Sequence, residues 1–317
     1  MTNAFWVQTS SSWGPSPLVS DALATKLASH KITDVWVTIG TFNGTSSLNF
    51  WTGGFQACVN NIHAHGMKAW AAEINSFPQS PINVSDYALA NACALTAKNF
   101  VKQYGFDGWI GGDENYTGNA STLAKDYCHF QQMIADAMHG IVQKHMWTPQ
   151  CWPGMSQARF DIYTIDTHTD AISPMVYDRV DPWIYQPALH KVLQTSVSPI
   201  LVGFAFRSTQ TPPTTHTLAD ELEMLDSELT SYPSELSKYV GTHLWFIGNP
   251  DNITAAEWGY WDAWPRKDSG LLDSVLLQSS PQPVTFMVNG VSYPSGSTLQ
   301  IPRGSILNIS VPQEVEA

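Results

Sequence analysis

The sequence predicts an α/β fold, a (β/α)8 TIM barrel, because short apolar segments alternate with amphipathic segments through most of the chain. A short apolar segment of this kind is typical of a parallel strand that helices cover on its outer face. A doubly wound open sheet is the alternative, but no glycine fingerprint follows the first strand. The expected strands are Phe5–Thr9, Val35–Ile39, Ala69–Glu73, Gly108–Gly111, Met146–Gln150, Ala171–Tyr177, Ile200–Phe206 and Leu244–Gly248.

Helical periodicity fills most of the intervals between these strands. One of the helices has recognisable ends, with Ser85 before it and Gly105 after it. The segment after the fifth strand is the least helical, and a final helical piece is expected over Ala255–Leu277. The other expected helices are Ser20–His30, Gly54–His65, Ser85–Tyr104, Ser121–Lys144, Trp183–Thr195 and Thr217–Leu229.

The composition changes after the last helical piece. Ser279-Ser280-Pro281-Gln282-Pro283 is typical of a linker, and Asn289-Gly290 between alternating segments is a strong hairpin signal. We therefore expect the barrel over residues 1–278 and a linker with a small all-β appendage, or a truncated β domain, over residues 279–317. The expected β segments are Val284–Val288, Ser297–Ile301 and Ile306–Val311.

The composition narrows the classes of partner. Among 317 residues, 43% are hydrophobic and only 13% are charged, and the net charge of -12 argues against a nucleic acid or an anionic membrane. No apolar run reaches the length of about 20 residues that spans a bilayer. The first residues show no secretory signal, which leaves the location of the protein open. Sugar-binding clefts use aromatic rings as stacking platforms, so the 13 tryptophans are compatible with an oligosaccharide as partner, whereas the alternative is that most of them belong to the core. A monomer is expected.

Neither a metal nor a cofactor is expected. Cys58, Cys93, Cys128 and Cys151 lack close metal-type spacing, so buried free thiols are the default, with a Cys58–Cys93 disulfide as the alternative. The pair His63 and His65 fits a helix end better than a pair of metal ligands.

Most residues that could carry chemistry follow the ends of expected strands, where a barrel keeps its active site. Two carboxylates, Asp113 and Glu114, stand directly after the fourth strand, and the glycines before them would let a ligand approach closely. The further acidic, amide and phenol groups at strand ends are Glu73, Asn75, Asn115, Tyr177 and Asp178. The candidate apolar and aromatic contacts to a substrate are Trp6, Trp109, Trp147, Met175 and Trp245.

The segment Tyr104-Gly-Phe-Asp-Gly-Trp109, followed by Glu114-Asn115, resembles the fourth-strand motif of the endo-β-N-acetylglucosaminidases. Chitinases carry a related Phe-Asp-Gly motif ending in Glu, and Gly111-Gly112-Asp113-Glu114 is similar to the Gly-Gly-Asp-Glu of β-N-acetylhexosaminidases. Met175-Val176-Tyr177-Asp178 resembles the Met-x-Tyr-Asp of chitinase strand six, and 66–77 resembles the third strand of these families. All are barrels in which the 2-acetamido oxygen of the substrate attacks the anomeric carbon.

The resemblance implies a role for each matching residue. Glu114 would be the general acid and then the base, with a pKa raised by partial burial and a nearby carboxylate. Tyr177 would donate a hydrogen bond to the acetamido oxygen, and Asp178 would support the sugar hydroxyls or the pKa of Glu114. Asp107 would be a buried structural carboxylate.

The chain departs from the pattern at Gly112, where chitinases place an Asp and the N-glycan endoglycosidases an Asn. Asp113 could replace that residue only if the strand ends or bulges at the glycine pair. Three hypotheses follow: a retaining enzyme acting on N-acetylated sugars, a glycosidase that pairs Glu114 with Glu73 or Asp178 as two ordinary carboxylates, and a catalytically silent sugar-binding barrel.

Overall fold

The computed structural model divides the chain into two compact units, Thr2–Lys267 and a smaller unit over Asp268–Ala317. It describes residues 1–8, 19–50, 53–73, 82–112, 116–117, 121–139, 141, 144–148, 157–165, 168–176, 181–206, 216–247, 250–266, 272–278, 285–288, 291–302 and 309–311.

The first unit is a closed barrel of parallel strands, which confirms the predicted fold class. Each strand pairs with the next along the chain, and β1 closes the ring by pairing with both β11 and β2. The ring consists of β1 (Thr2–Gln8), β2 (Asp34–Phe42), β4 (Lys68–Glu73), β6 (Gly108–Gly112), β8 (Lys144–Thr148), β9 (Ala171–Ile172), β10 (Ile200–Ala205) and β11 (Tyr239–Ile247). Among the residues that the structure describes in this unit, three short strands lie outside the ring: β3 (Leu48–Phe50), β5 (Ile82–Asn83) and β7 (Tyr116–Thr117).

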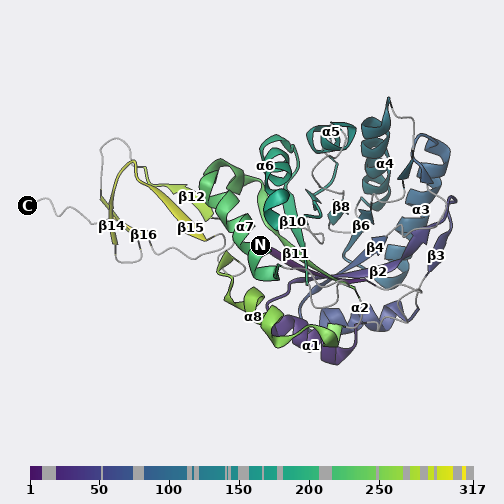
Figure 1. Ribbon diagram of the computed structural model, residues 1–317, viewed down its shortest axis with the longest axis horizontal. Coiled ribbons are helices and arrows are strands. Elements are labelled where there is room, and N and C mark those ends of the chain that lie inside the picture. Colours follow the sequence, from purple (N-terminus) through teal and green to yellow (C-terminus); the bar gives the residue numbers. More distant parts are fainter. Residues whose placement is uncertain are drawn as a thin grey trace, which may run out of the picture. The chain divides into compact units, whose positions relative to one another are not determined.

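Helices lie around the outside of this ring of strands (Figure 1). Their inner faces carry the buried residues, for example Leu23 and Leu27 of α1 and Leu189 of α6. The helices are α1 (Asp21–Ser29), α2 (Phe55–Ala64), α3 (Tyr87–Tyr104), α4 (Leu123–Met138), α5 (Gln157–Ile165), α6 (Gln186–Thr195), α7 (Leu218–Ser231) and α8 (Ala255–Ala263), with short 3-10 turns η1 (Pro182–Ile184), η2 (Pro233–Ser237) and η3 (Pro250–Asn252).

Several element boundaries differ from the expected ones. Helix α4 ends at Met138 rather than Lys144, because Lys144 already pairs with Gly108 as the first residue of β8. Helix α5 lies in the segment that showed the weakest helical pattern. Strand β9 is two residues long. Beyond Pro174, which has no N–H to donate, a single bridge from Met175 to Gly203 continues the pairing within the described residues.

The last expected helical piece was wrong in its second half. Helix α8 ends at Ala263, and Trp264 is extended at φ -74° and ψ 117°. Pro265 follows, and a residue before proline is disfavoured in helical geometry. Leu272–Leu276 then forms strand β12 of the smaller unit.

The predicted cap of α3, Ser85, was off by one residue, whereas the predicted end of the helix is confirmed. Asp86 caps the helix by accepting a hydrogen bond from the backbone N–H of Leu89. The hydroxyl of Ser85 instead donates to Asp126 of α4, at 2.6 Å. Gly105 ends the helix in the left-handed conformation, at φ 73°, which glycine adopts without strain.

The smaller unit is all-β, as the sequence predicted. Strand β12 pairs with β15 (Thr298–Pro302), while β13 (Thr285–Val288) pairs with β14 (Val291–Pro294) and β16 (Ile309–Ser310). The pair Val288 and Val291 closes the antiparallel ladder, which confirms the hairpin expected at Asn289-Gly290. The unit has a small core of its own, formed by Leu277, Phe286, Val288 and Leu299.

Three of the four cysteines lie in the described part of the chain. Cys58, Cys93 and Cys128 are buried free thiols, so the alternative of a Cys58–Cys93 disulfide was wrong. Cys151 lies outside the described residues. Within the described part, none of the helices has both the length and the hydropathy to cross a membrane.

Candidate active site at the carboxyl end of the barrel

Six of the polar residues that the sequence singled out come shortly after described strands of the ring. Asp113, Glu114 and Asn115 come after the last residue of β6, Gly112. Asn75 follows the end of β4 by two residues, and Tyr177 and Asp178 follow Val176. All six lie outside the described residues, so their roles stay predictions. The strand ends that lead to them belong to one closed ring.

The barrel interior below these strand ends is filled with indole rings. Trp6 and Trp36 contact each other with ring centroids 5.8 Å apart, and the ring of His243 lies 4.5 Å from that of Trp36. The indole N–H of Trp6 donates to the hydroxyl of Thr38 at 3.0 Å. Trp6 is therefore a fixed, 3% exposed part of the interior, not a freely accessible platform.

Three predicted contact residues belong to this interior cluster. Trp6 and Trp245 are paired in register on neighbouring strands, and Met175 is packed in the same cluster. Met175 is 8% exposed, and Trp245 is only partly buried. Of the three, Trp245 thus offers the most surface to a molecule above the barrel.

A polar cluster that the sequence reasoning missed lies within the same interior. The Nδ1 atom of His243 is 2.6 Å from the hydroxyl oxygen of Ser173, which also donates to the carbonyl of Leu201. Burial lowers the pKa of His243 to about 3, so the ring is neutral at physiological pH. A histidine on an apolar strand gave no sequence signal for this contact, because its partner lies 70 positions away in the chain.

Strand β6 is regular up to the residue before the two carboxylates. Its pairing with β8 runs from Gly108 to Gly112 without a register shift. Ile110 belongs to the interior cluster, whereas a side chain at Gly111 would meet Gln131 of α4, at 3.2 Å. Since side chains alternate along a strand, position 112 belongs to the interior face, and glycine places no functional group there. The described part of the glycine pair contains no bulge.

Glu73 does not face the barrel interior. Trp70 and Ala72 of the same strand are interior residues, and Glu73 pairs in register with the outward-facing Gly111. The thiol of Cys93 on α3 has its pKa raised to about 12 by burial and, secondarily, by the charge of Glu73. The Glu73 carboxylate, 1% exposed, therefore lies between the barrel and α3, and its predicted contact with a substrate does not fit this placement.

Two further predicted aromatic contacts belong to strands rather than to the open mouth. Trp109 has no exposed surface, and its ring contacts Phe42 with centroids 6.4 Å apart. It pairs in register with Ala71, on the face of β4 that does not belong to the interior cluster. We do not retain Trp109 in the proposed site, because an enclosed ring cannot stack on a sugar. Trp147 pairs with Gly111 and Ile172 through its backbone, and its side chain lies outside the described part.

Asp107 has the structural position expected for it, although its side chain is 22% exposed rather than buried. It accepts hydrogen bonds from the backbone N–H of Ala69, at 2.8 Å, and from His63, at 2.7 Å. This carboxylate joins the start of β4 to the end of α2. His63 therefore serves a helix end, as predicted.

Comparison with known proteins gives matches among solved structures alone: no family model and no curated protein matches this sequence. The spore cortex-lytic enzyme SleL of Bacillus cereus superposes with a TM-score of 0.60 at 11% identity, over 82% of this chain and 73% of that one. A chitinase from Rhizomucor miehei superposes with a TM-score of 0.58 at 12% identity, over 82% of this chain and 98% of that one. A GH18 chitinase from Pseudoalteromonas aurantia superposes with a TM-score of 0.56 at 12% identity, over 84% of this chain and 100% of that one.

The chain has the barrel fold of these chitinases. At this level of identity the likeness concerns the path of the backbone, and each site residue has to be argued from this chain itself. In this barrel, β6 is the fourth strand of the ring, counted along the chain from β1. The Asp113-Glu114 pair thus directly follows the fourth strand.

Proposed function

We propose that this protein is a glycoside hydrolase that cleaves β-linked glycans containing N-acetylhexosamine, with Glu114 as the general acid and base. The observation that carries the proposal is the place of Glu114 in the chain. It comes two residues after the described end of the fourth barrel strand, in a fold that chitinases share. Residues after the carboxyl ends of barrel strands form the active sites of such enzymes.

The barrel interior supports the same proposal. Trp6, Met175 and Trp245 provide an apolar floor at the carboxyl end of the strands, and Trp245 keeps part of its surface exposed. Pyranose rings bind to aromatic surfaces of this kind through their C–H faces. The floor excludes water from one side of a bound sugar, which strengthens the charge interactions that a carboxylate makes above it.

The proposed mechanism is a retaining one with assistance from the substrate. Glu114 protonates the oxygen of the leaving sugar while the 2-acetamido oxygen attacks the anomeric carbon, and Glu114 then removes a proton from the incoming water. Asp113 orients the acetamide, Tyr177 donates a hydrogen bond to its oxygen, and Asp178 supports the charge state of Glu114. Asn75 and Asn115 would bind sugar hydroxyls.

The alternative with two ordinary carboxylates is narrowed by the position of Glu73. Because that side chain faces α3, a nucleophile for Glu114 would have to come from another strand end. Asp178 is the remaining acidic candidate from the sequence. A separation of about 5 Å between the carboxyl groups would indicate retention, and one beyond about 6.5 Å would indicate inversion.

One observation favours a second candidate function, a sugar-binding barrel without catalysis. Strand β6 stays in register through Gly112, so the interior position two residues before Glu114 has no side chain to orient an acetamide. A barrel lacking that group could still bind a glycan on Trp245 and Met175. Calorimetry separates the two functions: binding of a chitin oligomer without any turnover would support the sugar-binding barrel.

The direct test is a hydrolysis screen of the purified protein against N-acetylated and plain glycans, with the variant Glu114→Gln beside it. We expect cleavage of chitin oligomers or aryl N-acetylglucosaminides, inhibition by a thiazoline analogue of the cyclised acetamide, and loss of cleavage in the variant. Activity on plain glycans alone, with no inhibition by the thiazoline, would contradict substrate assistance.

A further inference from the structure

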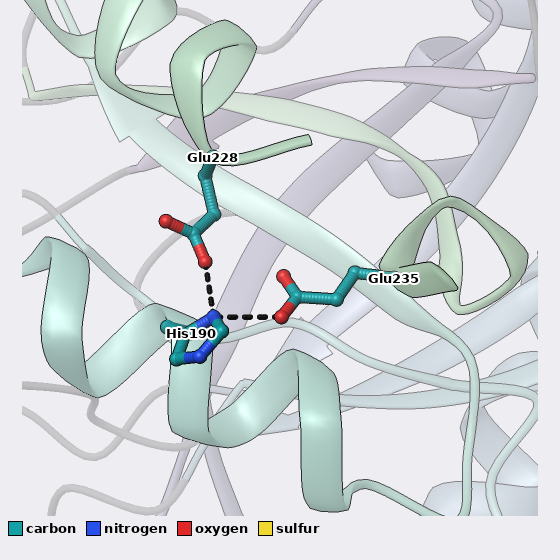
Figure 2. A group of neighbouring side chains, drawn as sticks. All are labelled: His190, Glu228 and Glu235. Carbon is teal, nitrogen blue, oxygen red and sulfur yellow. Dashed lines mark hydrogen bonds and ion pairs between the residues drawn. The ribbon is translucent and has the colours of Figure 1, made fainter. Parts of the chain in front are cut away.

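Three side chains that could bind a metal ion meet on the helical layer of the barrel. They are His190 of α6, Glu228 of α7 and Glu235 of η2, and their ligand atoms all lie within 4.8 Å of one another. Figure 2 shows the two carboxylates directed at one nitrogen of the imidazole ring. Three separate elements thus contribute one group each to a single point.

In this cluster two carboxylates approach the same ring nitrogen of His190. The Nδ1 atom of His190 lies 2.5 Å from an oxygen of Glu228 and 2.7 Å from an oxygen of Glu235. An imidazole nitrogen carries at most one hydrogen, so it can donate a well-aligned hydrogen bond to one of them. The hydrogen bond goes to Glu228. Glu235 has an ion-pair distance to the ring without a hydrogen bond of its own.

Glu235 is therefore a buried side chain whose carboxylate oxygens lack hydrogen-bond donors among the described residues. It is 2% exposed, and within the described part of the chain neither of its oxygens receives a hydrogen bond. Glu228 is equally enclosed, with a side chain 1% exposed. Burying two carboxylates together costs several kcal/mol unless a positive charge and good ligand geometry compensate. One imidazole, even when protonated, brings at most a single positive charge to the pair.

We propose that His190, Glu228 and Glu235 bind a divalent transition-metal cation of the zinc type. A dication would neutralise the charge of both carboxylates, and it would be coordinated by the Glu235 oxygens that lack hydrogen-bond donors. One nitrogen and two carboxylate oxygens suit zinc, whereas calcium and magnesium take oxygen ligands almost exclusively. Water would complete the coordination.

The surroundings fit this role. Zinc holds nitrogen and oxygen ligands at about 2.0–2.2 Å, so tetrahedral ligand atoms are roughly 3.4 Å apart, and the imidazole would retreat by less than about 1 Å. His190 is 26% exposed, which leaves it room to move. The side-chain amide of Gln186 donates to the other oxygen of Glu228 at 2.8 Å and fixes that carboxylate, as outer groups do in metal sites.

The cluster lies apart from the proposed active site. Glu235 belongs to the turn that leads into β11, and Lys238 at its end accepts a hydrogen bond from the backbone N–H of Ile200, the first residue of β10. It is thus at the amino end of the strands, opposite the end that carries Asp113 and Glu114. A cation there would join α6, α7 and η2, and would act on stability rather than on catalysis.

The experiment uses the full chain, stripped with a chelator and titrated with Zn²⁺ by calorimetry at neutral pH. We expect one Zn²⁺ ion to bind tightly per chain and to raise the midpoint of thermal unfolding. Mg²⁺ and Ca²⁺ should bind much more weakly and raise that midpoint much less. In the variant Glu235→Gln the affinity of this site for Zn²⁺ should fall at least tenfold. Asp262→Asn, which removes the partner of His30 in an exposed histidine–carboxylate pair, is the matched control and should bind zinc as the wild type does.

Circular dichroism of the zinc-free variants checks that both are folded, and Glu228→Gln gives a second test should Glu235→Gln prove unstable. The proposal is overturned if the wild type has no tight equivalent, or if the cluster variants and Asp262→Asn bind zinc equally well. An unchanged thermal midpoint with zinc, together with a Glu235→Gln variant more stable than the wild type, would show that the carboxylates merely share a proton.

Discussion

The imidazole of His243 fills the space that a side chain on Gly203 would need. A Cβ atom built on Gly203 would lie 2.1 Å from Cε1 of the ring and 2.6 Å from Nε2. Gly203 and His243 are paired in register on β10 and β11, so the absence of one side chain makes room for the other. The barrel interior thus depends on a glycine for its packing, not for its backbone freedom.

Gly203→Ala should therefore destabilise the protein by about 1–3 kcal/mol, because the added methyl group overpacks a rigid interior. Chemical denaturation of the purified variant measures this loss. The matched control is Gly259→Ala in α8, where a Cβ would meet nothing within 4 Å, and which should be neutral or slightly stabilising. The double variant Gly203→Ala with His243→Ala should lose less stability than the two single losses added together.

The buried His243 should give the protein a measurable acid sensitivity. Its folded pKa of about 3 lies below the ordinary value of 6.5, so the unfolded chain binds the proton first as the pH falls. The free energy of unfolding should decline below about pH 6.5, with a contribution of up to about 1.4 kcal/mol per pH unit from this group. Denaturation at a series of pH values checks the slope. An identical slope in His243→Gln would refute the assignment.

Asp126 holds together the start of α3 and the start of α4. It accepts hydrogen bonds from Ser85 at 2.6 Å, Thr122 at 2.7 Å and Tyr87 at 3.0 Å. Asp126→Asn should cost about 1–3 kcal/mol at neutral pH, because an amide group replaces an acceptor that three donors use. Asp136→Asn, an exposed position on the same helix, is the control and should change little.

The charge of Asp126 also predicts how this difference depends on pH. Burial works to raise its pKa, but the hydrogen bonds outweigh burial and lower the pKa below 3.8. The stabilisation is present above pH 3.8 and is lost as the pH falls through the lower folded value. The gap between wild type and Asp126→Asn should therefore shrink in strong acid. A gap that stays constant would contradict the role of the ionised carboxylate.

Two isosteric variants distinguish the proposed catalytic acid from a buried neighbour. Glu114→Gln should lower kcat by several orders of magnitude, since the amide can neither donate a proton to the leaving oxygen nor accept one from water. Glu73→Gln should keep kcat within a few-fold of the wild type, because that side chain faces α3. Steady-state hydrolysis of a chitin oligomer provides both values. Comparable losses in the two variants would favour the mechanism with two ordinary carboxylates.

The sequence predicted the order of strands and helices well, because a short apolar segment and an apolar period of 3.6 residues are local properties. The sequence-based prediction was weak where contacts with residues distant in the chain decide the length or type of an element. Pro174 shortens β9, and α5 forms in a segment with poor amphipathicity. Pro265 was visible in the sequence as a helix breaker and could have located the end of α8.

The candidate site was only partly predictable for the same reason. Strand ends could be located, but the direction of a side chain depends on register, and a change of one residue reverses the face. Glu73 and Trp109 were assigned to the mouth of the barrel, whereas pairing with Gly111 and Ala71 places them on the outer face. The cluster of His190, Glu228 and Glu235 joins three elements that are distant in the chain, and no motif signals it.

The tryptophan-filled interior also limits how a long substrate could be handled. Trp36 and Trp70 have 0% and 1% exposure, and the indole N–H of Trp70 donates to Asp34 at the amino end of β2, which closes the barrel from below. Such an interior is a core packed with side chains rather than a pore. A polysaccharide chain could lie across the open end, but it could never be threaded through the barrel. In the proposed reaction, the cleaved fragments would leave by the side on which the intact chain arrived.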